Sequence, residues 1–169
     1  TDLIDFKHET FDKRINTTDR LSYPKIQCKE SIMTEKLGNV APYVTKSIKM
    51  QSVSVDDYIS TDNMLQNCAG IVAYSGTPNI SSVTEYLKGD ILVSNIRPYL
   101  KKIWLADKNG GCSKDVLVFR NITPKTLNNE YLKVILSTQE FFDYMMVGKT
   151  GIKMPRGDKK IIPSFEVPI

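Results

Sequence analysis

The chain has 169 residues, 41% of them hydrophobic and 25% charged, with a formal net charge of +4 and a single histidine, His8. This length and composition predict one globular domain with its own core, and no apolar run reaches the roughly 20 residues that span a bilayer. A single histidine argues against a Ser-His-Asp triad and against an imidazole-based metal site.

Three cysteines, Cys28, Cys68 and Cys112, lie far apart and in no CxxC-like spacing. This spacing argues against a disulfide framework and a structural zinc site, and it fits a reducing cytoplasm. The N-terminus lacks the basic-then-apolar layout of a secretory signal. The chain also begins at Thr1 without an initiator methionine, which suggests an excised fragment.

Residues 1–34 carry many polar groups and little periodicity, although a short helix over 2–13 is compatible with the pattern. We expect these residues to form an N-terminal tail or linker. Residues 35–169, where apolar periodicity begins, are expected to form the folded domain.

Short apolar runs bounded by turn formers predict a series of strands in this domain. The first is expected over 37–40 and 43–44, followed by a polar loop over 46–54. Further strands are predicted at 58–60, 70–74, 82–86, 91–94, 103–106 and 116–119, with turns at 75–79, 88–90 and 107–111. The continuous apolar run at 116–119 is typical of a central strand.

After Pro124 the apolar period changes from two to about 3.6 residues, which indicates helices. The first is expected to start near Asn128, and capping-box spacing over 137–140 predicts a second that ends at Gly148. A last strand is predicted at 165–167. The fold class is therefore α+β, a curved mixed sheet of short strands with a late helical pair.

A short cationic turn follows the strand predicted at 91–94. It contains Arg97, Tyr99, Lys101 and Lys102 around Pro98. Arginine can make paired contacts to a guanine edge or a phosphate, lysines offer point charges, and tyrosine can stack or donate a hydrogen bond. A solvated hairpin tip is the alternative interpretation of the same residues.

A second cationic segment, residues 148–160, lies between the last predicted helix and the last predicted strand. It contains Lys149, Thr150, Lys153, Arg156, Lys159 and Lys160, with Asp158 as its acid. Clustered positive charge on an anchored loop is the pattern expected of a surface that meets phosphates. A disordered loop that only aids solubility is the alternative.

Two asparagines, Asn63 and Asn79, lie in polar segments where their amides could reach base edges or, alternatively, cap turns. Asp90 and Asp115 are expected to have turn or cap roles. No set of side chains in the sequence indicates an enzyme.

Several segments of residues 35–169, taken in their order along the chain, resemble the target-recognition domain of type I restriction-modification specificity subunits and of related fused restriction-methylation enzymes. They are Leu37-Gly38-Asn39-Val40, the run from Lys88 to Tyr99, Gly111 to Val116, Tyr131-Leu132, Gly151 to Arg156, and the closing Phe165 to Ile169. The resemblance implies a domain that reads one half of a split site in duplex DNA. Two such domains, held apart by long helices, would then set the half-site spacing.

The resemblance also implies which partners supply the chemistry. No Asn-Pro-Pro-Tyr or Asp-Pro-Pro-Tyr motif of adenine methyltransferases occurs in the sequence. S-adenosylmethionine, ATP and magnesium are therefore expected only in partner methyltransferase and restriction subunits, and no cofactor is expected in this chain.

The expected interface combines both cationic segments with the two asparagines. Phosphate contacts would come from Lys101, Lys102, Lys149, Lys153, Lys159 and Lys160, and base readout from Arg97, Tyr99, Arg156, Asn63 and Asn79. A regulatory fragment that docks on a methyltransferase is the first alternative. A binder of single strands or RNA is the second, although it would need more exposed aromatic residues than Tyr99.

Overall fold

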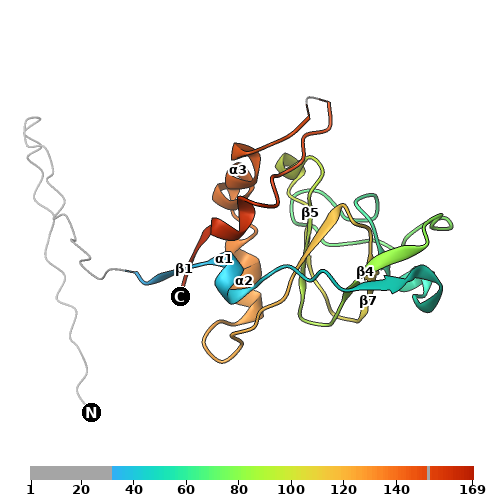
Figure 1. Ribbon diagram of the computed structural model, residues 1–169, viewed down its shortest axis with the longest axis horizontal. Coiled ribbons are helices and arrows are strands. Elements are labelled where there is room, and N and C mark those ends of the chain that lie inside the picture. The colour runs from blue at the N-terminus through green and yellow to red at the C-terminus, as the bar shows by residue number, and fades with distance from the viewer. Residues whose placement is uncertain (1–31, 152) are drawn as a thin grey trace, which may run out of the picture. The chain divides into compact units, whose positions relative to one another are not determined.

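The computed structural model describes residues 32–151 and 153–169 (Figure 1). The helix considered over 2–13 lies outside the described residues, as does most of the expected tail. No helix in the described part of the chain is long and apolar enough to cross a membrane.

A three-stranded antiparallel sheet lies at the centre of the hydrophobic packing, in the order β6 (Ile103–Leu105), β5 (Ile91–Ser94) and β8 (Val116–Phe119). Alternate side chains of these strands enter two different cores. Ile91 and Val93 belong to one buried cluster, whereas Leu92 belongs to another. The sheet therefore has a core on each face, which explains why its strands are apolar throughout.

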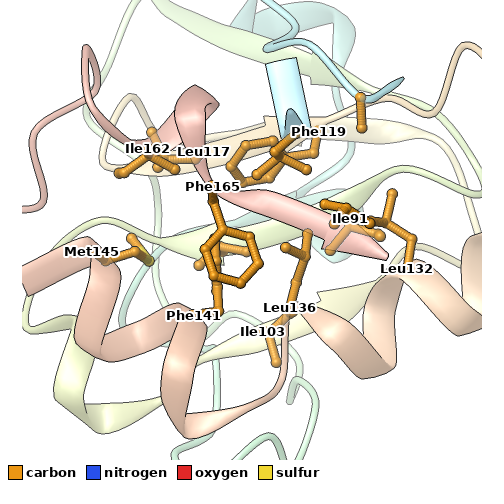
Figure 2. Close-up of a cluster of buried hydrophobic side chains, with 14 of the residues drawn as sticks. Ile91, Ile103, Leu117, Phe119, Leu132, Leu136, Phe141, Met145, Ile162 and Phe165 are labelled. Carbon is orange, nitrogen blue, oxygen red and sulfur yellow. The ribbon is translucent and has the colours of Figure 1, made fainter. Parts of the chain in front are cut away.

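One of these cores is covered by two helices, α2 (Asn129–Ile135) and α3 (Gln139–Val147). Asn128 caps α2 by accepting hydrogen bonds from two backbone N–H groups, and Thr138 caps α3 by accepting one from Phe141. Figure 2 shows the side chains that fill the space between helices and sheet, among them Ile91, Ile103, Phe119, Leu132, Leu136 and Phe141.

The second core lies between this sheet and a mixed four-stranded sheet, in the order β2 (Ser47–Lys49), β4 (Ser82–Tyr86), β7 (Gly110–Cys112) and β3 (Tyr58–Ile59). The β3 and β7 strands are parallel, and the other pairs are antiparallel. Gly110 and Gly111 let β7 lie between its neighbours. A Cβ at Gly110 would collide with the Asp57 carbonyl, and one at Gly111 would collide with Val83.

A small two-stranded sheet joins β1 (Thr34–Lys36) to β9 (Glu166–Pro168), and the single-turn helix α1 (Leu37–Val40) follows β1. Short 3-10 turns complete the described structure: η1 (Met50–Ser52), η2 (Val55–Asp57), η3 (Pro98–Leu100) and η4 (Ile162–Ser164). These elements confirm the predicted α+β class, with mixed and antiparallel sheets and a late helical pair.

Several element predictions are wrong in informative ways. Residues 37–40 form a helical turn, because Leu37 and Val40 are three positions apart and both bury on one face. Residues 70–74 form only an isolated bridge between Ile71 and Met64. The capping residue of α3 is Thr138 rather than Ser137, whose hydroxyl donates to the Lys133 carbonyl oxygen.

The position of β8 also differs from the prediction. It is an edge strand, and β5 is the central one. The outer edge of β8 is nevertheless covered, because Val44 donates its N–H to the Val118 carbonyl oxygen at 2.9 Å. This cover explains why a strand at the edge carries the continuous apolar run of a central strand.

Candidate nucleic-acid interface

The cationic turn between β5 and β6 has a constrained backbone. Arg97 has φ 48° and Lys101 has φ 51°, on either side of η3. Residues other than glycine seldom adopt this left-handed conformation, which costs about 1–2 kcal/mol per residue. Two such residues in one turn indicate that surrounding contacts hold it in place.

At the Lys101 end, the carbonyl oxygens of Leu100 and Lys101 accept from the N–H groups of Asn67 and Cys68. At the Arg97 end, the contacts come from the cationic loop after α3. Arg97 donates its backbone N–H to the Pro155 carbonyl oxygen at 2.8 Å, and Ile96 and Arg156 form a β-bridge. Thr150 and Arg156 exchange two backbone hydrogen bonds, each of 2.9 Å, which close the loop on itself. The loop is therefore a docked structure, which contradicts the alternative of a disordered segment for its described residues.

We call residues 97–102, 148–151 and 153–160 together the junction surface. Figure 1 shows the loop that follows α3 extending at the same end of the molecule as the turn after β5. Side chains predicted to bind DNA are exposed across this surface: Arg97, Tyr99, Lys149, Thr150, Lys153, Arg156, Lys159 and Lys160. The structure thus brings together two segments that the sequence separates.

Two lysines of this surface have structural contacts as well. The Lys102 ammonium donates to the Thr61 carbonyl oxygen at 2.6 Å, and the Lys159 ammonium donates to the Lys114 carbonyl oxygen at 3.3 Å. Each ammonium has three donors, so each keeps capacity for a phosphate. Lys101 is half-buried in the turn.

Asn63 does not fit the base-reading role predicted for it. Its side chain is 3% exposed, its Oδ1 accepts from Ser60 N–H at 2.7 Å, and its Nδ2 donates to the carbonyl oxygens of Tyr58 and Val72. The three hydrogen bonds of the Asn63 amide are all made to backbone atoms of its own region of the chain. The prediction is wrong because Asn63 replaces backbone pairing inside a buried turn, as asparagine does in many turns.

Asn79 is exposed and lines a polar hollow of about 580 Å³ beside the junction surface. Thr61, Asp62, Lys114 and Asp115 line the same hollow. Asn79 therefore lies near the cationic segments without belonging to them.

Sequence reasoning missed the role of Asp115. A turn or cap role was expected and Asp115 does lie in a turn, but its Oδ1 also lies 3.3 Å from Nη2 of Arg156, with the two side chains 42% and 51% exposed. The backbone of Asp115 is held by Ser113 Oγ, which accepts its N–H, and by Asn95, which donates to its carbonyl oxygen. No local pattern indicates this ion pair, because its partners are distant in sequence.

Asn95 is a second residue that positions this surface, and its sequence signal is no more than its place at the end of a strand. It is 3% exposed, and its Nδ2 donates to the Gly157 carbonyl oxygen, 62 positions away, at 3.3 Å. Gly157 returns a backbone hydrogen bond to the Asn95 carbonyl oxygen. Asn95 thereby joins β5, the Asp115 segment and the cationic loop.

The described residues offer cations and an exposed phenol at this surface. Among residues 32–151 and 153–169, no group of three or more His, Cys, Asp or Glu side chains is placed to hold a metal ion. Burial raises the pKa of the Cys112 thiol to about 12, so this thiol is not a nucleophile at neutral pH. The surface is suited to binding a polyanion.

No protein-family model matches the chain, and no curated protein matches it. Solved structures do share its fold, and they are specificity (S) subunits and a complex of type I restriction-modification systems. The chain therefore shares a fold with these subunits, as the sequence resemblance implied.

Three of these structures are similar at low sequence identity. A chain from a study of complex assembly and conformational transition of the type I system has a TM-score of 0.64 and 19% identity over 81% of this chain. The HsdS subunit from Thermoanaerobacter tengcongensis has a TM-score of 0.62 and 18% identity over 81% of this chain. The S subunit from M. genitalium has a TM-score of 0.52 and 16% identity over 86% of this chain. The chain spans 37% of the length of each.

Proposed function

We propose that this chain recognises a sequence in duplex DNA, as one target-recognition domain of a restriction-modification specificity subunit. The observation that carries this proposal is the docking of the cationic loop on the cationic turn through Arg97 and Pro155. It gathers basic side chains from both segments on one surface, in a chain that has the fold of S subunits.

Different residues of the junction surface suit different parts of DNA. Lys149, Lys153 and Lys160 are exposed and suit phosphate contacts, which fix position without reading sequence. Arg97 and Arg156 present planar guanidinium groups on a fixed backbone, which suits paired hydrogen bonds to a guanine edge in the major groove.

The chain would read one half-site for partner subunits. An adenine methyltransferase that uses S-adenosylmethionine and an endonuclease that uses ATP and magnesium would supply the chemistry. The match to little more than a third of each S subunit supports a role as one part of a larger recognition unit.

Duplex binding measured against salt concentration tests this function. The 169-residue chain should bind duplex DNA with an affinity that falls steeply with salt, because each neutralised phosphate contributes about −0.9 to the slope of log K against log salt. Lys153→Glu should weaken binding to all sequences. Lys125→Glu is the matched control, since Lys125 is exposed outside the junction surface.

The main rival is a fragment that only docks on a methyltransferase. It would show a flat salt response and no difference between the two variants. Such a result would refute DNA recognition by this surface.

A further inference from the structure

Asp115 is an acid in contact with the junction surface, a position that is unexpected beside a surface that binds phosphates. Asp115 pairs with Arg156 at 3.3 Å and follows Lys114, whose carbonyl oxygen accepts a hydrogen bond from the Lys159 ammonium. A carboxylate here opposes a phosphate approaching Arg156, because like charges repel at short range. Phosphate binding alone does not account for Asp115.

Both partners of this ion pair stand on anchored backbone. The Asp115 carbonyl oxygen accepts from Asn95 N–H at 2.8 Å, and Arg156 is tied to Thr150 by two hydrogen bonds of 2.9 Å. Asn95 also holds Gly157, the residue after Arg156. One continuous network around Asn95 therefore holds the backbones of the two residues near each other.

The side chains themselves can exchange this contact for another. They are 42% and 51% exposed, and exposed ion pairs are weak because water and salt screen them. Arg156 also has five N–H donors, more than one carboxylate can use. A ligand with the right pattern of acceptors and donors can therefore insert beside or between them.

The major-groove edge of a G·C base pair has that pattern. Guanine presents the acceptors N7 and O6, which suit a guanidinium, and cytosine presents the N4 donor next to them, which suits a carboxylate. We propose that Asp115 is a specificity-determining residue that forms, together with Arg156, a reading unit for one G·C pair and weakens competing phosphate contacts. This inference rests on the proposed function and adds to it the base pair read and the residue that excludes phosphate.

Selection from a randomised duplex library, followed by sequencing of the bound fraction, tests the unit. The 169-residue chain should enrich G·C at one position of its target. Asp115→Asn should lose that preference by roughly 5- to 150-fold, the range of one base-specific contact. Its binding to unrelated duplexes should strengthen, with a salt slope steeper by up to about 0.9.

Asp57→Asn is the matched control. Asp57 pairs with Lys108 at 2.9 Å, and both side chains are 37% exposed, outside the junction surface. It should change neither base preference nor salt slope. Thermal unfolding of each variant verifies folding, and Arg156→Gln replaces Asp115→Asn if the latter does not fold, with the same base position relaxed.

The outcomes separate the two proposals. A parent chain that enriches no sequence refutes the proposed function and this inference with it. A parent chain that enriches a sequence, with Asp115→Asn enriching the same bases at every position, refutes only the reading unit. Equal weakening of target and unrelated duplexes by Asp115→Asn also refutes it, because that result indicates a structural ion pair.

Discussion

Arg97 donates its backbone N–H to the carbonyl oxygen of Pro155, so the turn after β5 and the loop after α3 are joined by main-chain atoms. Main-chain hydrogen bonds do not depend on which side chains the two residues carry. The side chains of Arg97, Lys149 and Lys153 can therefore vary while this main-chain link between the turn and the loop is kept.

Gly157→Ala should displace the loop after α3 from the turn after β5. A Cβ at residue 157 would lie 2.9 Å from Asn95 Oδ1 and 3.2 Å from the Met145 carbonyl oxygen. Overpacking of this kind costs about 1–3 kcal/mol. We expect a lower melting temperature and weaker duplex binding, measured by calorimetry and fluorescence anisotropy. Gln51→Ala, at an exposed position of η1, is the control, and full binding by Gly157→Ala would contradict the docking of this loop.

Asn63→Ala should act on stability and not on base preference. The substitution leaves Ser60 N–H and the carbonyl oxygens of Tyr58 and Val72 without their amide partner. An unsatisfied buried group costs about 1–3 kcal/mol. Urea unfolding measures this loss. A stable Asn63→Ala variant that relaxes one base of the target would restore the base-reading role.

Asp90→Ala should be among the most destabilising single changes in the sheet. Asp90 is 2% exposed, and its carboxylate oxygens lie 2.9 and 2.7 Å from Nε and Nη2 of Arg120. The carboxylate is buried but the Arg120 side chain is 33% exposed, so removing the carboxylate should cost about 1–3 kcal/mol. Lys46→Ala breaks the exposed pair with Glu85 and should cost less than about 1 kcal/mol in the same unfolding assay. Similar losses for both variants would contradict this distinction.

Cys112 predicts loss of stability at alkaline pH. Burial raises the pKa of its thiol from 9.0 to about 12 in the folded chain, so the thiol ionises first in the unfolded chain. The contribution of the neutral Cys112 thiol to the free energy of unfolding is complete below pH 9.0 and is lost as the pH rises toward about 12. Cys112→Val should reduce the pH dependence of the unfolding free energy in this window by up to about 1.4 kcal/mol per pH unit. Tyr58→Phe provides a comparison, because burial also raises the pKa of Tyr58 to about 12.

Much of the fold can be predicted from side-chain pattern alone. The strands at 82–86, 91–94 and 116–119 and the cap at Asn128 agree with the structure, because apolar runs and caps act locally. β7 was missed because its glycines are typical of a turn. They occur in a strand here because Asp57, Tyr86 and Val83 leave no room for a side chain.

The candidate site was predictable in its parts but not in its assembly. Clustered charge indicates the turn and the loop, whereas their docking depends on backbone atoms that carry no sequence signal. Asn63 and Asn79 look alike in sequence, and only burial separates them. For Asp115 the sequence predicts a turn or cap and gives no sign of the ion pair, because its partner, Arg156, comes close only in the folded chain.

The small sheet at the margin of the domain has a further consequence. Thr34 lies opposite Pro168, so the first and last strands of the described domain run side by side in opposite directions. In a longer polypeptide that contained this domain, the chain would enter at β1 and leave at β9 at nearly the same place. A domain bounded by two such adjacent strands can be exchanged for another while the rest of the polypeptide keeps its position.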